Sequence, residues 1–181
     1  MREAAVNWIP FYAAMVGAAA AVMGLLFIAV QLSMERLPAD ERKGWQSVAF
    51  CTFYLYLTGF FLPLWFLMPS FGTGSHAVIA LIVAIIGIVR IARASIPIWH
   101  GVLRIGGNRW WQMLWYSVGP LILYLLIVYD AGKAHFGQWQ DVTERNVAIV
   151  LVALFSLALR NSWKLFVEAA FQARDGDRTG S

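Results

Sequence analysis

The sequence predicts an all-α protein, a polytopic transmembrane helical bundle with five spans. The first observation is composition, because 60% of the 181 residues are hydrophobic and only 13% are charged. An average soluble domain is about 45–50% apolar and about 25% charged. The second observation is that five stretches are long and apolar enough to cross a bilayer. The third is that Lys and Arg gather at alternate ends of these stretches. Together they argue against a soluble enzyme and against a disordered chain.

The chain is interpreted as one transmembrane domain, residues 1–173, followed by a polar tail. The predicted spans are residues 9–30, 47–68, 77–99, 111–129 and 147–167. The first span contains no charged residue. The fourth contains Gly119-Pro120, where we expect a kink because proline interrupts regular helical hydrogen bonding. The polar tail, residues 174–181, is expected to be frayed.

The third and fifth spans are each interrupted by an arginine. Each has 13 uncharged residues before its first charge, Arg90 in one and Arg160 in the other. A spanning helix needs about 20 residues. Each segment therefore crosses the bilayer only if its helix continues past the arginine, to Trp99 and to Val167 respectively. The alternative is a four-span protein in which one of these segments lies in the membrane interface.

The distribution of Lys and Arg predicts the orientation of the chain. With the N-terminus outside, the cytoplasmic segments hold eleven of these residues and the outer segments hold three. Because Lys and Arg are enriched in cytoplasmic loops, we expect the N-terminus outside and the C-terminus in the cytoplasm. The net charge of +4 is then interpreted as a basic collar facing anionic lipid headgroups. We expect the bilayer, and no nucleic acid, to be the partner of these charges.

Small residues recur along one face of the first predicted helix. At 100° per residue this face holds Ala13, Gly17, Ala20, Gly24 and Gln31. Small side chains let helices approach closely, and a polar side chain on such a face finds a partner across the interface. Two interpretations stay open. The face packs inside one subunit, or it forms the contact of a homo-oligomer.

The same helix carries the one resemblance to known proteins. The run Gly17–Ala21 followed by Gly24–Val30 reads GAAAA and GLLFIAV. It resembles the opening helix of small, uncharacterised bacterial integral membrane proteins, over about a tenth of the chain. The resemblance implies a multi-pass protein of the cell membrane, in bacteria the inner membrane. It implies no activity.

Four basic residues in the third and fifth spans are the candidate functional residues. Arg90 and Arg160 each lie about 20 Å along their spans, within a hydrocarbon core about 30 Å thick. Arg93 and Lys164 follow them by about one helical turn. No Asp or Glu is predicted at that depth.

Three interpretations of these basic residues remain open. Their side chains reach lipid phosphates at the inner surface. They form a cationic ring in a water-filled vestibule that favours anions. They cap helix carbonyls or bond to a polar side chain of another helix, of which the candidates are Gln31, Tyr54 and Tyr116.

No catalytic, cofactor or metal-binding pattern is found in the sequence. The three histidines, His76, His100 and His135, fall in loops or at span ends, and the single cysteine, Cys51, excludes a CxxC motif. The isolated serines lack a base and an orienting acid. We therefore expect no enzyme and no cofactor. Two functions are retained: a small homo-oligomeric ion channel that favours anions, or a non-conducting accessory protein that binds anionic lipid or a partner protein.

Overall fold

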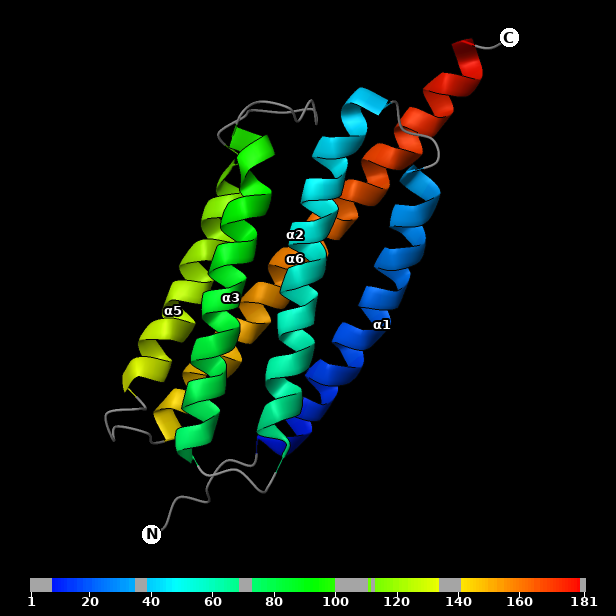
Figure 1. The fold of residues 1–181 in the computed structure, drawn as a ribbon. Helices are drawn as coiled ribbons and strands as arrows, with labels where there is room; N and C mark the ends of the chain where they lie inside the picture. The colour runs from blue at the N-terminus through cyan, green and yellow to red at the C-terminus, as the bar shows by residue number, and fades with distance from the viewer. Residues whose placement is uncertain are drawn as a thin grey trace.

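The computed structural model describes residues 8–34, 39–68, 73–99, 111, 113–133 and 141–179. Within these ranges the chain is helical and contains no strand. The elements are α1 (Ile9–Met34), α2 (Ala39–Phe66), α3 (Thr73–Trp99), the π-helical turn η1 (Leu114–Val118), α5 (Gly119–Lys133) and α6 (Asp141–Thr179). Figure 1 shows these helices side by side in one bundle, with the N- and C-termini at opposite ends.

Five helical stretches of the described chain are long and apolar enough to cross a membrane. They are Ile9–Gln31, Trp45–Phe66, Ser75–Ile96, Leu114–Lys133 and Arg145–Val167. The prediction of an all-helical protein with five such helices is therefore confirmed. The third and fifth are continuous helices through Arg90 and Arg160, as expected.

Two details of the helices differ from the sequence prediction. The last helix continues well beyond Val167 and reaches Thr179, so most of the predicted polar tail is helical; residues 180 and 181 lie outside the described residues. Ala, Glu and Gln, which are good helix formers, make up most of residues 168–173, with which this extension begins. The second difference lies at Gly119-Pro120, where the sequence predicted a kink. The structure has the wider η1 turn directly before this pair, and the Gly119 N–H donates to the carbonyl of Leu114. Pro120 has no N–H to continue the regular α-helical pattern, and π-helical turns of this kind are frequent at functional sites.

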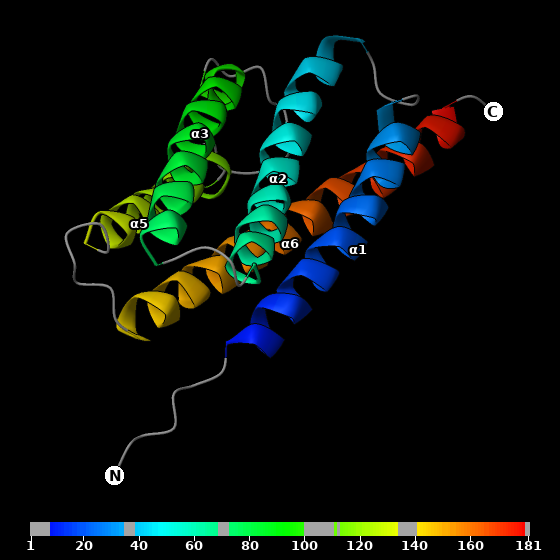
Figure 2. The same cartoon turned by 60° about the horizontal axis from the view of Figure 1, so that its bottom comes forward.

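The central helix of the bundle is α2. It packs against α1, α3 and α6, while α5 fills the space between α3 and α6 and α1 also touches α6. In the membrane-spanning window of α2, 56% of the residues are buried, against 17% for α1. Figures 1 and 2 both show α1 at the edge of the bundle. The α1 helix therefore has most of its surface available to lipid or to another protein.

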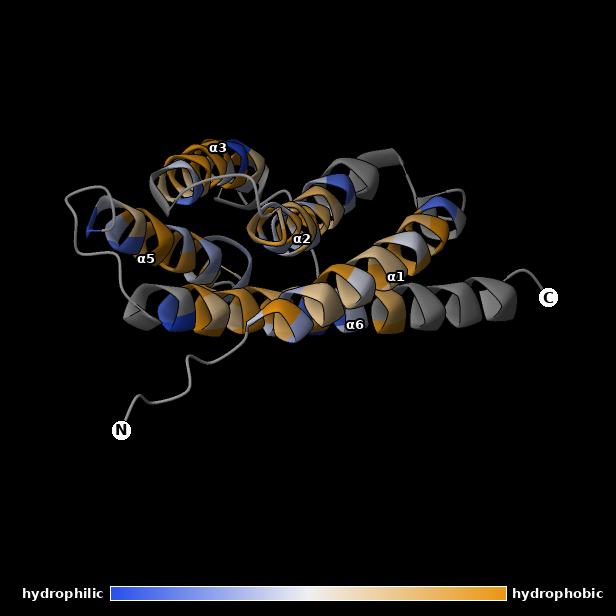
Figure 3. Cartoon of the chain, turned by 90° about the horizontal axis from the view of Figure 1, so that it is seen from below, coloured by the Kyte–Doolittle hydropathy of each residue, from blue (hydrophilic) through white to orange (hydrophobic). Residues whose placement is uncertain are grey.

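The outward surface of the bundle is apolar. Large hydrophobic side chains such as Leu25 (64% exposed) and Ile149 (61% exposed) point away from the core. Figure 3 shows hydrophobic residues prevailing along the helices and hydrophilic ones placed mainly toward their ends. This distribution is typical of helices surrounded by lipid, since a soluble protein of this size would not expose so much apolar surface.

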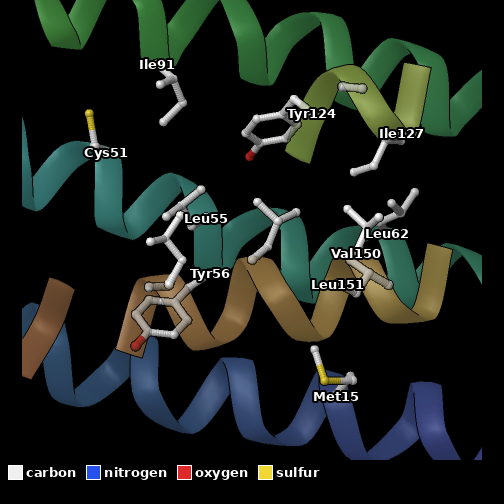
Figure 4. Close-up of a cluster of buried hydrophobic side chains, with 14 of the residues drawn as sticks. Met15, Cys51, Leu55, Tyr56, Leu62, Ile91, Tyr124, Ile127, Val150 and Leu151 are labelled. Atoms are coloured by element: carbon white, nitrogen blue, oxygen red, sulfur yellow. The ribbon is translucent and has the colours of Figure 1, made fainter. Parts of the chain in front are cut away.

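Aliphatic residues and two buried tyrosines fill the centre of the bundle. Leu55, Leu62, Tyr56, Tyr124 and Ile127 are all 0% exposed. In Figure 4 the Tyr124 ring extends from α5 between α3 and α2, and the Tyr56 ring extends from α2 toward α6. These side chains occupy the interior of the subunit.

The two tyrosine hydroxyls join helices across the core. Tyr56 Oη lies 3.1 Å from Ser162 Oγ of α6, and Tyr124 Oη lies 2.6 Å from Thr58 Oγ1 of α2. Ser162 donates to the carbonyl of Ala158 and Thr58 to that of Tyr54. Since each hydroxyl has a single hydrogen, the tyrosines are the donors in both interhelical bonds.

Candidate functional site

Arg160 lies at the contact between α6 and the η1 turn. Its guanidinium carbon is 4.1 Å from the centre of the Trp115 ring, a cation–π distance. Its Nη1 also donates to Oδ1 of the neighbouring Asn161 at 3.4 Å, and the side chain is half-buried. Arg160 precedes Val167, the end of the span, by seven residues, or about 10 Å along the helix. The guanidinium is thus held by an aromatic ring and an amide within the candidate span.

The two residues that contact Arg160 each carry a buried hydrogen-bond donor without an acceptor. Asn161 is 0% exposed, and its Nδ2 has no hydrogen-bond partner. Trp115 Nε1 is likewise buried and has no partner. Buried donors are normally paired, since an unpaired one costs about 1–3 kcal/mol. Together with the guanidinium, these groups form a donor-rich site, and no carboxylate is paired with Arg160 in the described part of the chain. We call Arg160, Asn161 and Trp115 the Arg160 site.

The η1 turn places Trp115 in this site. The turn also buries Tyr116 and Ser117 against the bundle, so its own position is set by packing. In addition, Trp111 packs edge-on against Trp115 at a ring separation of 5.9 Å. The wider η1 turn thus presents the Trp115 ring to Arg160 on α6. The sequence predicted only a kink at Gly119-Pro120 and not this contact.

The other candidate basic residues occupy different surroundings. Arg90 and Arg93 are exposed on α3, on a surface shared with exposed apolar residues such as Val89. Lys164 is half-buried on α6, one turn after Arg160. Viewed along the bundle, α3 and α6 lie on opposite sides of it, as Figure 3 shows. Arg90 and Arg160 therefore stand on helices that lie on opposite sides of the subunit.

None of the three polar partners suggested for the arginines takes part in these contacts. The contacts of Arg160 are with Trp115 and Asn161, whereas the candidates were Gln31, Tyr54 and Tyr116. The sequence did contain one indication of a partner for Arg160. Asn161 is a polar residue next to this arginine inside an apolar span. Trp115 could not be found this way, because its approach to Arg160 depends on how η1 packs against α6.

The small-residue face of α1 is exposed along its whole length. All five of its residues are exposed: Ala13, Gly17, Ala20, Gly24 and Gln31. A Cβ added at Gly17 or at Gly24 would meet no atom within 4 Å. The face therefore makes no close helix contact within the described subunit and is open to lipid or to another protein.

A buried carboxylate lies at the other end of the bundle. Asp130, in the last turn of α5, is 8% exposed, and its Oδ1 accepts a hydrogen bond from Asn146 Nδ2 of α6 at 3.4 Å. The sequence places this aspartate at a span end, but only the packing of α5 on α6 buries it. Among the described residues, no three His, Cys, Asp or Glu side chains lie close enough together to hold a metal ion.

Comparisons with known proteins assign no relative to this chain. No protein-family model, no curated protein and no solved structure matches it. Its function is therefore inferred from the chemistry of the Arg160 site and from the exposed surfaces of the bundle.

Proposed function

We propose that this chain is a non-enzymatic, multi-pass membrane protein that binds the phosphate of an anionic lipid headgroup at the Arg160 site. The observation that carries the proposal is the set of donors around Arg160. The half-buried guanidinium contacts Trp115 and Asn161, each of these two residues carries a buried N–H donor without a partner, and no carboxylate of the described residues is paired with Arg160. Phosphate oxygens accept several charge-assisted hydrogen bonds at once, so they match such a site.

The depth of the site fits a headgroup that is reached from the membrane surface. Arg160 lies about 10 Å inside the end of its span, a distance that an arginine side chain shortens by extending toward the interface. Arg90 and Arg93 have the same charge as Arg160, but their side chains are exposed on α3. We propose that they interact with headgroups as ordinary snorkelling residues, without a defined site.

The proposal places the Arg160 end of the bundle at the cytoplasmic face of a cell membrane, in bacteria the inner membrane. Its support is the excess of Lys and Arg, eleven residues against three, in the segments at that end. Several of these, including Arg36, Arg104 and Arg109, lie outside the described residues. A cytoplasmic leaflet rich in anionic lipid would supply the ligand.

Lipid-dependent thermal stability tests the proposal. We expect phosphatidylglycerol to raise the unfolding temperature of the detergent-purified protein more than phosphatidylcholine does, because a ligand of the folded state stabilises it. This difference should disappear in Arg160→Ala and persist in Arg90→Ala, a matched variant that removes an exposed arginine of similar depth. If the wild type and both variants show the same difference in unfolding temperature between the two lipids, Arg160 forms no anion site.

A homo-oligomeric channel is the second candidate function. The observation that favours it is the exposed face of α1, where Gly17 and Gly24 leave room for a close helix contact. Because Tyr56, Tyr124 and other side chains fill the interior of the subunit, a pore would have to lie between subunits. We propose anion selectivity for such a pore, with the basic residues at its cytoplasmic mouth.

Mass measurement and ion flux decide on this second function. A channel requires an oligomer in detergent that Gly24→Leu disrupts, whereas Ala18→Leu, an exposed change outside the small-residue face, leaves it intact. Proteoliposomes should then pass chloride, and the flux should fall with Gly24→Leu. A monomeric protein, or vesicles that stay tight to chloride and to small cations, would exclude the channel and leave the lipid-binding function standing.

A further inference from the structure

The η1 turn is one residue wider than an α-helical turn. In η1 the Gly119 N–H donates to the carbonyl of Leu114, five residues earlier, whereas in an α-helix it would donate to Trp115, four residues earlier. Each residue of an α-helix turns the chain by about 100° and advances it by about 1.5 Å. Whether this turn is π-helical or α-helical therefore decides which side chain of η1 faces α6.

Helix α5, which follows the turn, is held in place by the core. Tyr124 of α5 is 0% exposed, and its hydroxyl lies 2.6 Å from Thr58 Oγ1 of α2. If the turn were α-helical, Trp115 would take the place that Leu114 now has relative to α5. Leu114 is 39% exposed on the outside of the bundle. The π-helical turn therefore keeps the Trp115 ring on Arg160, 4.1 Å from its guanidinium carbon.

A proline inside a helix does not by itself widen the turn before it. Pro63 of α2 is buried within a candidate span, as Pro120 is, and the residues on both sides of Pro63 are α-helical. Both prolines lack an N–H, and in an α-helix the ring of each crowds the carbonyl four residues earlier. The residue before the proline differs, because it is Leu62 in α2 and Gly119 before α5. The comparison points to Gly119 as the residue that permits the wider turn.

Gly119 has no side chain at a place where the wider turn brings a carbonyl close. A Cβ at position 119 would lie 3.1 Å from the carbonyl oxygen of Leu114, which accepts the Gly119 N–H, and 3.6 Å from Cδ2 of Leu157 on α6. The first distance is shorter than the usual separation of nonbonded heavy atoms. A side chain at position 119 thus disfavours the π-helical turn, while Pro120 disfavours the α-helical one.

We propose that Gly119 and Pro120 are positioning residues of the Arg160 site, which hold η1 in the register that places Trp115 on Arg160. Pro120 disfavours the α-helical register, and Gly119 accommodates the wider one. Both residues act through the position of the Trp115 ring and of its buried N–H. For lipid binding, this inference rests on the function proposed above.

The variant Gly119→Ala/Pro120→Ala, which removes both causes of the wider turn, tests the inference. The readout is the coupling between Arg160→Gln and Trp115→Leu, made singly and together, in the unfolding temperature in lipid-free detergent. We expect these two changes to be non-additive in the wild-type background and additive in the Gly119→Ala/Pro120→Ala background. The matched control is Gly59→Ala/Pro63→Ala, a glycine and a proline of α2, in which the coupling should persist.

Deletion of Val118 separates a change of register from a loss of stability. In the Gly119→Ala/Pro120→Ala background, this deletion within η1 brings Leu114 and position 119 to the α-helical spacing of four. Trp115 then regains its place relative to α5, so the coupling should return. Binding of dioleoyl phosphatidylglycerol, titrated by native mass spectrometry, should follow the same order. We expect it to weaken about tenfold in Gly119→Ala/Pro120→Ala, the loss typical of one hydrogen bond to a charged group, and to recover with the deletion.

The outcomes separate the positioning role from the lipid site. Undiminished coupling in folded Gly119→Ala/Pro120→Ala would overturn the inference, as would coupling that deletion of Val118 does not restore. Additivity already in the wild type would also overturn it, because Trp115 would then not act on Arg160. If the double variant does not fold, Pro120→Ala alone is compared in the same way, and persistent coupling there has the same meaning. Coupling that is lost and restored as expected, without binding of phosphatidylglycerol by the wild type, would support the positioning role and refute the lipid site.

Discussion

The contact between Gly87 and Tyr124 is the tightest place for a new side chain among the described glycines. The Tyr124 ring of α5 packs directly on the backbone of α3 at Gly87. A Cβ at position 87 would lie 2.6 Å from Tyr124 Cζ and 2.8 Å from Cδ1. Real Cβ atoms do not approach other heavy atoms this closely, so Gly87→Ala requires the ring or one of the two helices to move.

The ring has little freedom to move. Tyr124 is 0% exposed, and its hydroxyl is bonded to Thr58 at 2.6 Å. Overpacking a close-packed core costs about 1–3 kcal/mol. Against this, alanine is favoured over glycine inside a helix by about 0.5–1 kcal/mol. We therefore expect Gly87→Ala to destabilise the protein by about 1–2 kcal/mol.

Thermal unfolding in detergent, followed by circular dichroism, measures this effect. For chains of about 150–250 residues, 1 kcal/mol corresponds to about 2–4 °C in Tm, so Gly87→Ala should lower Tm by about 2–8 °C. The matched control is Gly59→Ala on α2. Gly59 is also buried within a helix, but a Cβ there would meet nothing within 4 Å. This variant should match or exceed the wild-type Tm.

A double variant tests the proposed reason for the loss. Tyr124→Phe removes the bond to Thr58 and lets the ring shift, so Gly87→Ala should cost less in that background, with a coupling of about 0.5 kcal/mol or more. A Gly87→Ala protein as stable as Gly59→Ala would refute the close packing of α3 on α5. Strict additivity with Tyr124→Phe would refute the role of the hydroxyl in holding the ring.

Two further predictions concern the core. Tyr56→Phe and Ser162→Ala should each lower stability, with a coupling of about 0.6 kcal/mol in a double-mutant cycle, because the Tyr56 hydroxyl donates to Ser162; zero coupling would mean that the bond adds nothing. Leu55→Ala, at a side chain that is 0% exposed, should cost about 2–5 kcal/mol in unfolding experiments. Leu25→Ala, at 64% exposure, should cost under about 1 kcal/mol. Similar losses for the two leucines would contradict the assignment of buried and lipid-facing sides.

The sequence predicted the helices well because the bilayer imposes a length. The third and fifth spans are the best examples, since 13 uncharged residues do not cross, so a span there requires the helix to continue through Arg90 or Arg160. The helices observed there are continuous through both arginines. The far end of α6 was not predicted, because beyond the bilayer no hydrophobic requirement marks where a helix stops.

The candidate site could be predicted only in part. The depth of Arg160 within its span, and the absence of a nearby acid in sequence, follow from the chain order. The partners of Arg160 do not. Asn161 is adjacent in sequence, but its burial depends on how the other helices pack against α6, and Trp115 reaches Arg160 only because the η1 turn faces α6.

The sequence by itself predicted the five apolar segments that are helical in the structure and the place of each charged residue along them. The tertiary structure alone decided that α2 is central and α1 peripheral, that Tyr124 packs on Gly87, and that Arg90 and Arg160 lie in different environments. The physical reason is that lipid tails are as apolar as leucine. Hydropathy therefore distinguishes membrane from water, but it does not distinguish the side of a helix that faces lipid from the side that faces another helix.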